Sequence, residues 1–131
     1  PLPPTQGQSS VNDISSSKLQ AKNIDNHVRR AEIAPSERAF ISERILENLS
    51  SIEGSSQRVQ GNILGTSLSH YAGNLPSSLI SVFSALNNMR AILPITNIDN
   101  LKQLNNSLQN SIDGMVYSSS RLKNAVITRK I

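Results

Sequence analysis

Residues 97–126 read NIDNLKQLNNSLQNSIDGMVYSSSRLKNAV, and their apolar side chains recur every three or four positions. That spacing places them on one narrow face of an α-helix over roughly four heptads. The rest of this helix is mostly Asn, Gln and Ser, so its stability must come from burying the apolar face against a partner. We therefore predict a helix at about 97–128 that packs against the preceding helix or a neighbouring copy of the chain. Its packing seam consists of Leu101, Leu104, Leu108, Ile112, Met115, Val116, Leu122 and Val126.

A second amphipathic helix is predicted at about 36–53. Pro35 and Ser36 are typical of a helix start, and Glu37 complements the positive end of the helix dipole. Gly54 is expected to end or kink this helix. The side chains that should pack on its apolar face are Ile41, Ile45, Leu49 and Ile52.

Two further helices are predicted at about 55–72 and 77–93. Pro94 stops the second of them, and Asn97 is a good cap for the terminal helix. Because the connection between these two helices is short, we expect them to form an antiparallel hairpin.

The first 35 residues lack a regular apolar period. The stretch from Pro1 to Ser17 is dense in Pro, Gln and Ser, which predicts a mostly disordered or extended arm over residues 1–35. A short helix through Ile24 to Ile33 remains open. The fold class expected is therefore all-α, with an unstructured arm preceding a helical region at 36–131.

The net charge of +4 is concentrated towards the end of the chain, in Arg121, Lys123, Arg129 and Lys130. Basic residues in the last turns of a helix offset its negative carbonyl end. No aromatic residues are interleaved with these cations, so no nucleic-acid partner is expected.

No run of apolar residues is long enough to span a bilayer as a helix. The sequence begins at Pro1 rather than Met, so a cleaved signal peptide upstream remains open.

Few residues could carry chemistry. The sequence contains no Cys, which excludes disulfides and thiolate nucleophiles. His27 and His70 do not show a metal-binding spacing, and Glu43 and Glu47 fall on the polar side of a predicted helix. We expect no enzyme activity, no metal and no cofactor.

The terminal segment, from Asn97-Ile-Asp-Asn-Leu101 through Leu122-Lys-Asn-Ala-Val126, resembles the carboxy-terminal helix of the inner rod subunits of bacterial type III secretion systems. The segment Ile41-Ser-Glu-Arg-Ile-Leu-Glu-Asn-Leu49 is similar to a helix that many members of that family carry in mid-chain. The chain departs from the family in continuing through Val126-Ile-Thr-Arg-Lys-Ile131 and in a longer, Gly-richer middle region.

The resemblance implies a non-catalytic subunit that polymerises helically in the periplasmic part of the injectisome and lines the export channel. Its implied partners are copies of itself, the needle subunit, the export-apparatus proteins and the secretin and basal-body rings, with unfolded cargo passing through the lumen. Such a subunit is itself exported through the type III pathway.

Three alternatives remain open. The chain could be another axial component, such as a needle or flagellar rod protein. It could instead be a type III secreted effector, for which richness in Ser and Asn is equally expected. A small basic protein associated with nucleic acid is the third, and salt-dependent binding would reveal it.

Overall fold

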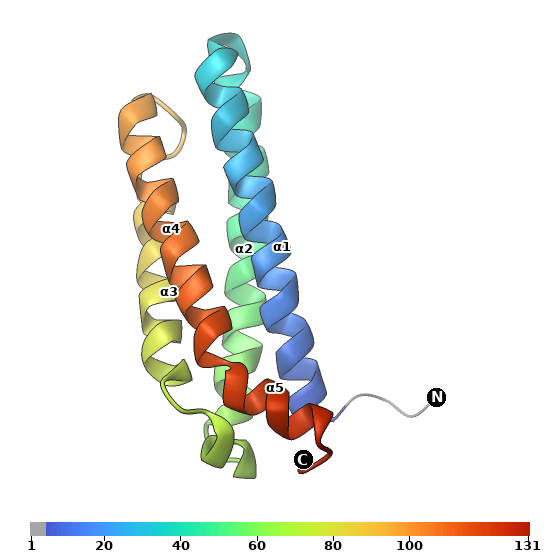
Figure 1. The fold of residues 1–131 in the computed structure, drawn as a ribbon. Coiled ribbons are helices and arrows are strands. Elements are labelled where there is room, and N and C mark those ends of the chain that lie inside the picture. The colour runs from blue at the N-terminus through green and yellow to red at the C-terminus, as the bar shows by residue number, and fades with distance from the viewer. Residues whose placement is uncertain (1–4) are drawn as a thin grey trace.

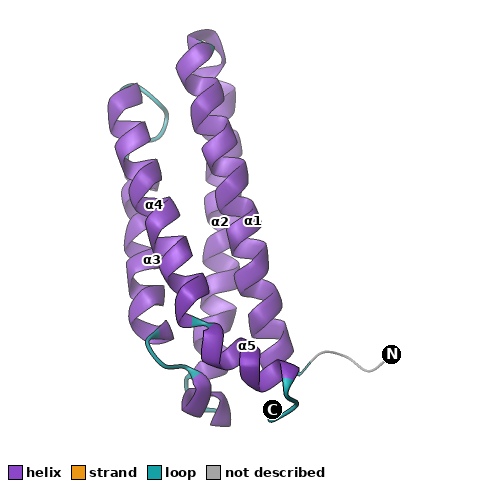
Figure 2. Ribbon diagram, in the orientation of Figure 1, coloured by secondary structure: helices purple, strands orange, loops and turns teal. Residues whose placement is uncertain are grey.

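The computed structural model describes residues 5–131, and these form an all-α domain without strands (Figure 2). Four long helices run side by side, and a short fifth helix crosses the end of the bundle at which α1 begins and the chain ends (Figure 1). The predicted all-α class is confirmed. The elements are α1 Gln6–Ile33, a 3₁₀ turn at Pro35–Glu37, α2 Arg38–Ile63, a 3₁₀ turn at Ser67–Tyr71, α3 Leu75–Ala91, α4 Ile98–Ser118 and α5 Ser120–Ile127.

The helices pack around a single core. α1 packs on α2 and α4, and α3 packs on α4 and α2, so each long helix has two neighbours. The buried positions in α1 and α4 alternate in steps of three and four, which is the spacing of helices that pack nearly parallel or antiparallel with interlocking side chains. In α1 these positions are Gly7, Ser10, Ile14, Ser17, Ala21, Ile24, Val28 and Ala31.

The prediction of a disordered arm over residues 1–35 is wrong for residues 5–35, and residues 1–4 lie outside the described part of the chain. Thr5 caps α1 by accepting a hydrogen bond from the Gln8 amide at 3.2 Å. The helix then runs unbroken to Ile33. It was missed because most of its core positions hold small residues, which leave only a weak apolar signal. The short helix left open at Ile24 to Ile33 is the last part of α1.

The predicted break at Gly54 is also wrong. α2 continues through Gly54 to Ile63, so the helices expected at 36–53 and 55–72 are one helix followed by a turn. A glycine inside a helix costs only about 1 kcal/mol relative to alanine. Burial of Ile52 on one side of Gly54 and Val59 on the other outweighs that cost. The turn after α2 instead uses Gly65, whose φ of 78° lies in the left-handed region.

The second half of the chain follows the prediction more closely. α3 and α4 form the expected hairpin (Figure 1), and Asn97 caps α4 by accepting a hydrogen bond from the Asn100 amide at 3.1 Å. The terminal helix does not run straight from 97 to 128, because it is interrupted at Ser119. The Ser119 hydroxyl donates to the Val116 carbonyl at 2.6 Å, and α5 leaves in a new direction.

Close packing at Gly7 holds the chain end against the start of α1. A Cβ placed on Gly7 would lie 2.8 Å from Ile131 and 3.2 Å from Val126. A side chain there would have to displace the tip of the Ile131 side chain, so glycine at this position permits the close contact.

The core contains several buried polar side chains. Most have partners: Ser17 donates to the Asp13 carbonyl at 2.9 Å, and Asn105 donates to the Asp25 carboxylate, also at 2.9 Å. Small and polar core residues bury less apolar surface than Leu or Ile, so the bundle gains less per residue from the hydrophobic effect. The buried polar residues are Ser10, Ser17, Ser42, Ser55, Ser56, Asn105 and Ser119.

Two of these serines should respond oppositely to alanine. Ser42 accepts a hydrogen bond from the Ile95 amide at 2.9 Å, so Ser42→Ala leaves a buried donor without a partner and should cost about 1–3 kcal/mol. The hydroxyl of Ser56 is buried without a hydrogen-bond partner among residues 5–131, so Ser56→Ala should leave stability unchanged or raise it by up to about 1 kcal/mol. Urea unfolding of both variants gives the comparison, and equal losses would contradict this assignment of partners.

Candidate functional site

The predicted seam of the terminal helix lies inside the chain's own core. Leu101, Leu108, Ile112, Met115 and Leu122 have no exposed surface. The remaining three seam residues are partly buried: Leu104 and Val116 pack against the core, and Val126 lies beside the start of α1.

The predicted packing residues of the middle helix lie in the same core. Ile45, Leu49 and Ile52 are fully buried, and Ile41 is 3% exposed. The structure thus brings together the two sets of apolar residues that the sequence singled out. It places them in contact with other helices of the same chain rather than on an open face.

The two histidines are far apart. His27 lies near the end of α1, and His70 lies in the 3₁₀ turn at the opposite end of the bundle. Burial lowers the pKa of His27, the positive charge of Arg44 lowers it further, and Glu47 partly opposes both effects. Glu47 also pairs with Arg44 at 3.1 Å on the exposed surface of α2. Over residues 5–131, no group of three or more His, Asp and Glu side chains is arranged to hold a metal ion.

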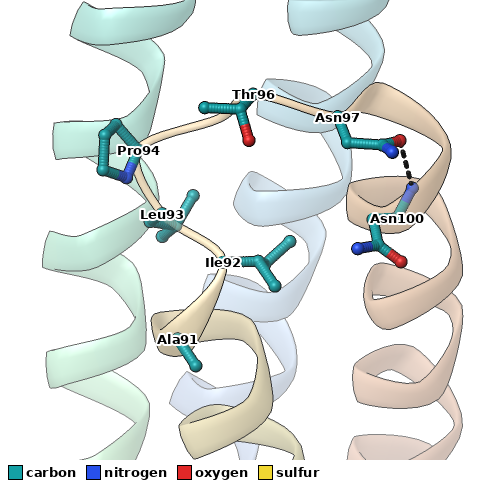
Figure 3. Close-up of a pocket in the computed structure, with 7 residues that line it drawn as sticks. All are labelled: Ala91, Ile92, Leu93, Pro94, Thr96, Asn97 and Asn100. Carbon is teal, nitrogen blue, oxygen red and sulfur yellow. Dashed lines mark hydrogen bonds between the residues drawn. The ribbon is translucent and has the colours of Figure 1, made fainter.

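A recess lies at the loop that connects α3 to α4 (Figure 3). Its volume is about 320 Å³. The side chains around it are aliphatic, hydroxyl or amide, and the Asn97–Asn100 capping bond lies on its α4 side (Figure 3). Such groups can bind through van der Waals contact and hydrogen bonds, but they supply no acid, base or nucleophile. The lining residues are Ala91, Ile92, Leu93, Pro94, Thr96, Asn97 and Asn100.

Among residues 5–131, no helix is both long enough and apolar enough to cross a membrane.

Comparison of the chain with protein families, curated proteins and solved structures gave no match. The candidate functional features are therefore the buried seam and the surfaces at the two ends of the bundle.

Proposed function

We propose that the chain is a non-catalytic structural subunit of the inner rod of a type III secretion system. The observation that carries the proposal is that the two segments resembling that family are both helical and line one core. Leu108 of α4 and Leu49 of α2, one from each segment, are fully buried in it. In this proposal the subunit lies in the periplasmic part of the apparatus, between the export apparatus and the needle.

Assembly requires the seam to change partners. In the single chain the seam packs on α1 and α3, whereas in a rod the same leucine face would pack on helices of neighbouring subunits. Exchange of equivalent helices between copies conserves the contacts and so has a low net cost. The serine-rich core supports such an exchange, because a core with less apolar surface opens at a smaller cost. A core of that kind also favours unfolding of the subunit for its own export.

A second candidate is a secreted effector of the same pathway. The observation that favours it is the closure of the bundle: the seam is already satisfied within one chain, as expected of a domain that works as a monomer. An effector would also pass through the channel unfolded, so the serine-rich core suits both candidates.

Secretion of an unrelated type III cargo distinguishes the rod subunit from the effector. Cells lacking this gene would be complemented with the original chain, with Leu108→Asp or with Asn106→Asp. Leu108 is fully buried and Asn106 is exposed on the same helix, so the two changes introduce the same charge in different surroundings. For a rod subunit, cargo secretion is lost with Leu108→Asp and kept with Asn106→Asp.

For an effector, cargo secretion is normal in all three strains and in the uncomplemented deletion. That result would contradict the rod proposal. A purified secretion apparatus containing the chain in many copies would support it independently.

A further inference from the structure

The end of the bundle formed by α5, the 3₁₀ turn at Ser67–Tyr71 and the start of α1 carries the whole net charge of the protein. We call this surface the α5 end. Four cations belong to it: Arg121, Lys123, Arg129 and Lys130. Residues 5–12, 59–75 and 117–131, which make up this end, contain no Asp or Glu. The other nine Lys and Arg of the chain are balanced by its nine Asp and Glu.

Ion pairing follows the same division. Outside the α5 end, seven of the nine cations lie in ion pairs, most of which join different helices, such as Lys18 with Asp113 and Lys102 with Glu32. Within the described residues, none of the four cations of the α5 end takes part in an ion pair. The α5 end is therefore a positively charged surface on a bundle that is otherwise nearly neutral, and such a surface attracts an anionic partner.

Exposed apolar side chains lie at the same end of the bundle as these cations. Tyr117 is 83% exposed at the end of α4, Ile127 is 78% exposed on α5, and Leu64 is 60% exposed after α2. α5 lies across the end of the bundle (Figure 1). Leu122 and Ala125 are buried in the core, whereas Ile127 is exposed on the same helix. A surface that combines cations with exposed apolar side chains suits the interface of a bilayer, where both kinds of group find partners.

The cations also border shallow clefts. Arg121 lines one of about 320 Å³ with Tyr117 and Gly73, and a second of about 140 Å³ with Tyr71 and Lys130. Lys130 lines a third of about 290 Å³ beside the start of α1. The basic side chains therefore stand at the edges of recesses into which small anionic groups could fit.

We propose that the α5 end docks on the surface of an anionic phospholipid bilayer. The positive charges would contact lipid phosphate and carboxylate groups, and Tyr117 and Ile127 would enter the boundary of the acyl chains. The combination favours lipid over nucleic acid, because binding to nucleic acid depends on phosphate contacts and gains little from exposed aliphatic residues. The inference does not depend on whether the chain is a rod subunit or an effector.

The test is cosedimentation of the full chain with vesicles of phosphatidylcholine containing about 30 mol% phosphatidylserine, compared with phosphatidylcholine alone. We expect binding to the anionic vesicles, weakening as salt rises from about 50 to about 300 mM, and none to the neutral ones. Each cation should contribute roughly fivefold to partitioning, so Arg121→Gln/Lys130→Gln should lower it by about 25-fold. The matched control Lys22→Gln/Arg29→Gln, which removes the same charge from the side of α1, should change it by less than about twofold.

The apolar contribution has its own matched pair. Ile127→Ser should lower partitioning by about tenfold, whereas Ile33→Ser, which alters an isoleucine of similar exposure at the opposite end, should leave it within about twofold. Equal effects of the paired variants, or binding to neutral vesicles as strong as to anionic ones, would overturn the proposal. Binding to duplex DNA or to polyglutamate that is tighter than binding to the anionic vesicles would also overturn the proposal, if Ile127→Ser leaves that binding unchanged. Far-UV circular dichroism of each variant checks that the helices persist.

Discussion

Leu108→Asp is expected to cause a large loss in the free energy of unfolding of the bundle. Leu108 has no exposed surface and lies in the middle of α4, so the substitution both empties a leucine-sized volume and buries a carboxylate. The two effects together should cost about 4 kcal/mol or more. Domains of this size are stabilised by about 5–15 kcal/mol, so the variant should lose between about a quarter and nearly all of the bundle's free energy of unfolding. The measurement is urea unfolding followed by far-UV circular dichroism.

Asn106→Asp is the matched control for that variant. It introduces the same charge two residues earlier, at an exposed position of the same helix, and should change the free energy of unfolding by less than about 0.5 kcal/mol. Similar losses in the two variants would mean that the effect at Leu108 comes from the added charge and not from the burial of that position.

Ile24→Asp should be nearly as damaging, although it lies in the part of the chain for which the sequence predicted disorder. Ile24 is fully buried in α1, the helix that packs on α2 and α4. We expect a loss of about 4 kcal/mol or more in the free energy of unfolding. The same urea titration measures it.

Leu19→Asp is the control for Ile24→Asp, because Leu19 is 58% exposed on the same helix. Its effect should stay within about 0.5 kcal/mol. If residues 1–35 formed an extended arm, both changes would be neutral. A large loss at position 19 with none at position 24 would mean that α1 presents the opposite face to the core.

The contrast between Leu19 and Ile24 shows why α1 was difficult to predict. Hydropathy gives Leu19 and Ile33 the same weight as Ile24 and Val28, yet the first two are exposed and the last two buried. The true buried face shows only when Ala, Ser and Gly are accepted as core residues. A signal was present in the three-and-four spacing of Ile14, Ala21, Ile24, Val28 and Ala31, but serines at positions 10 and 17 interrupt its apolar character.

The boundaries of α3 and α4 were easier because local chemistry decides them. Pro94 ends the first helix within a few residues, and the side chain of Asn97 caps the second. The continuity of α2 through Gly54 and the break at the end of α4 depend instead on tertiary packing. Gly54 is tolerated because its neighbours are buried, whereas Ser119 accompanies a change of direction although serine occurs elsewhere inside the helices.

The seam was predictable in its residues but not in its partner. The spacing of Leu101, Leu108 and Ile112 shows that one face of the helix is buried, and it holds no information on which chain covers that face. The positive charge of the α5 end was likewise only partly predictable. Its four cations are visible in the sequence, but the neutrality of the rest depends on pairs such as Lys18 with Asp113, which only the fold brings together.

Hydrogen exchange of backbone amides tests most directly whether α1 belongs to the same cooperative core as the seam. We predict that amides of residues 14–31 exchange only through the opening that also exposes residues 101–115, with free energies of opening equal within about 1 kcal/mol. Exchange of residues 14–31 at the rate of an unfolded chain, with residues 101–115 still protected, would contradict the account and restore a disordered arm beside an independently packed hairpin.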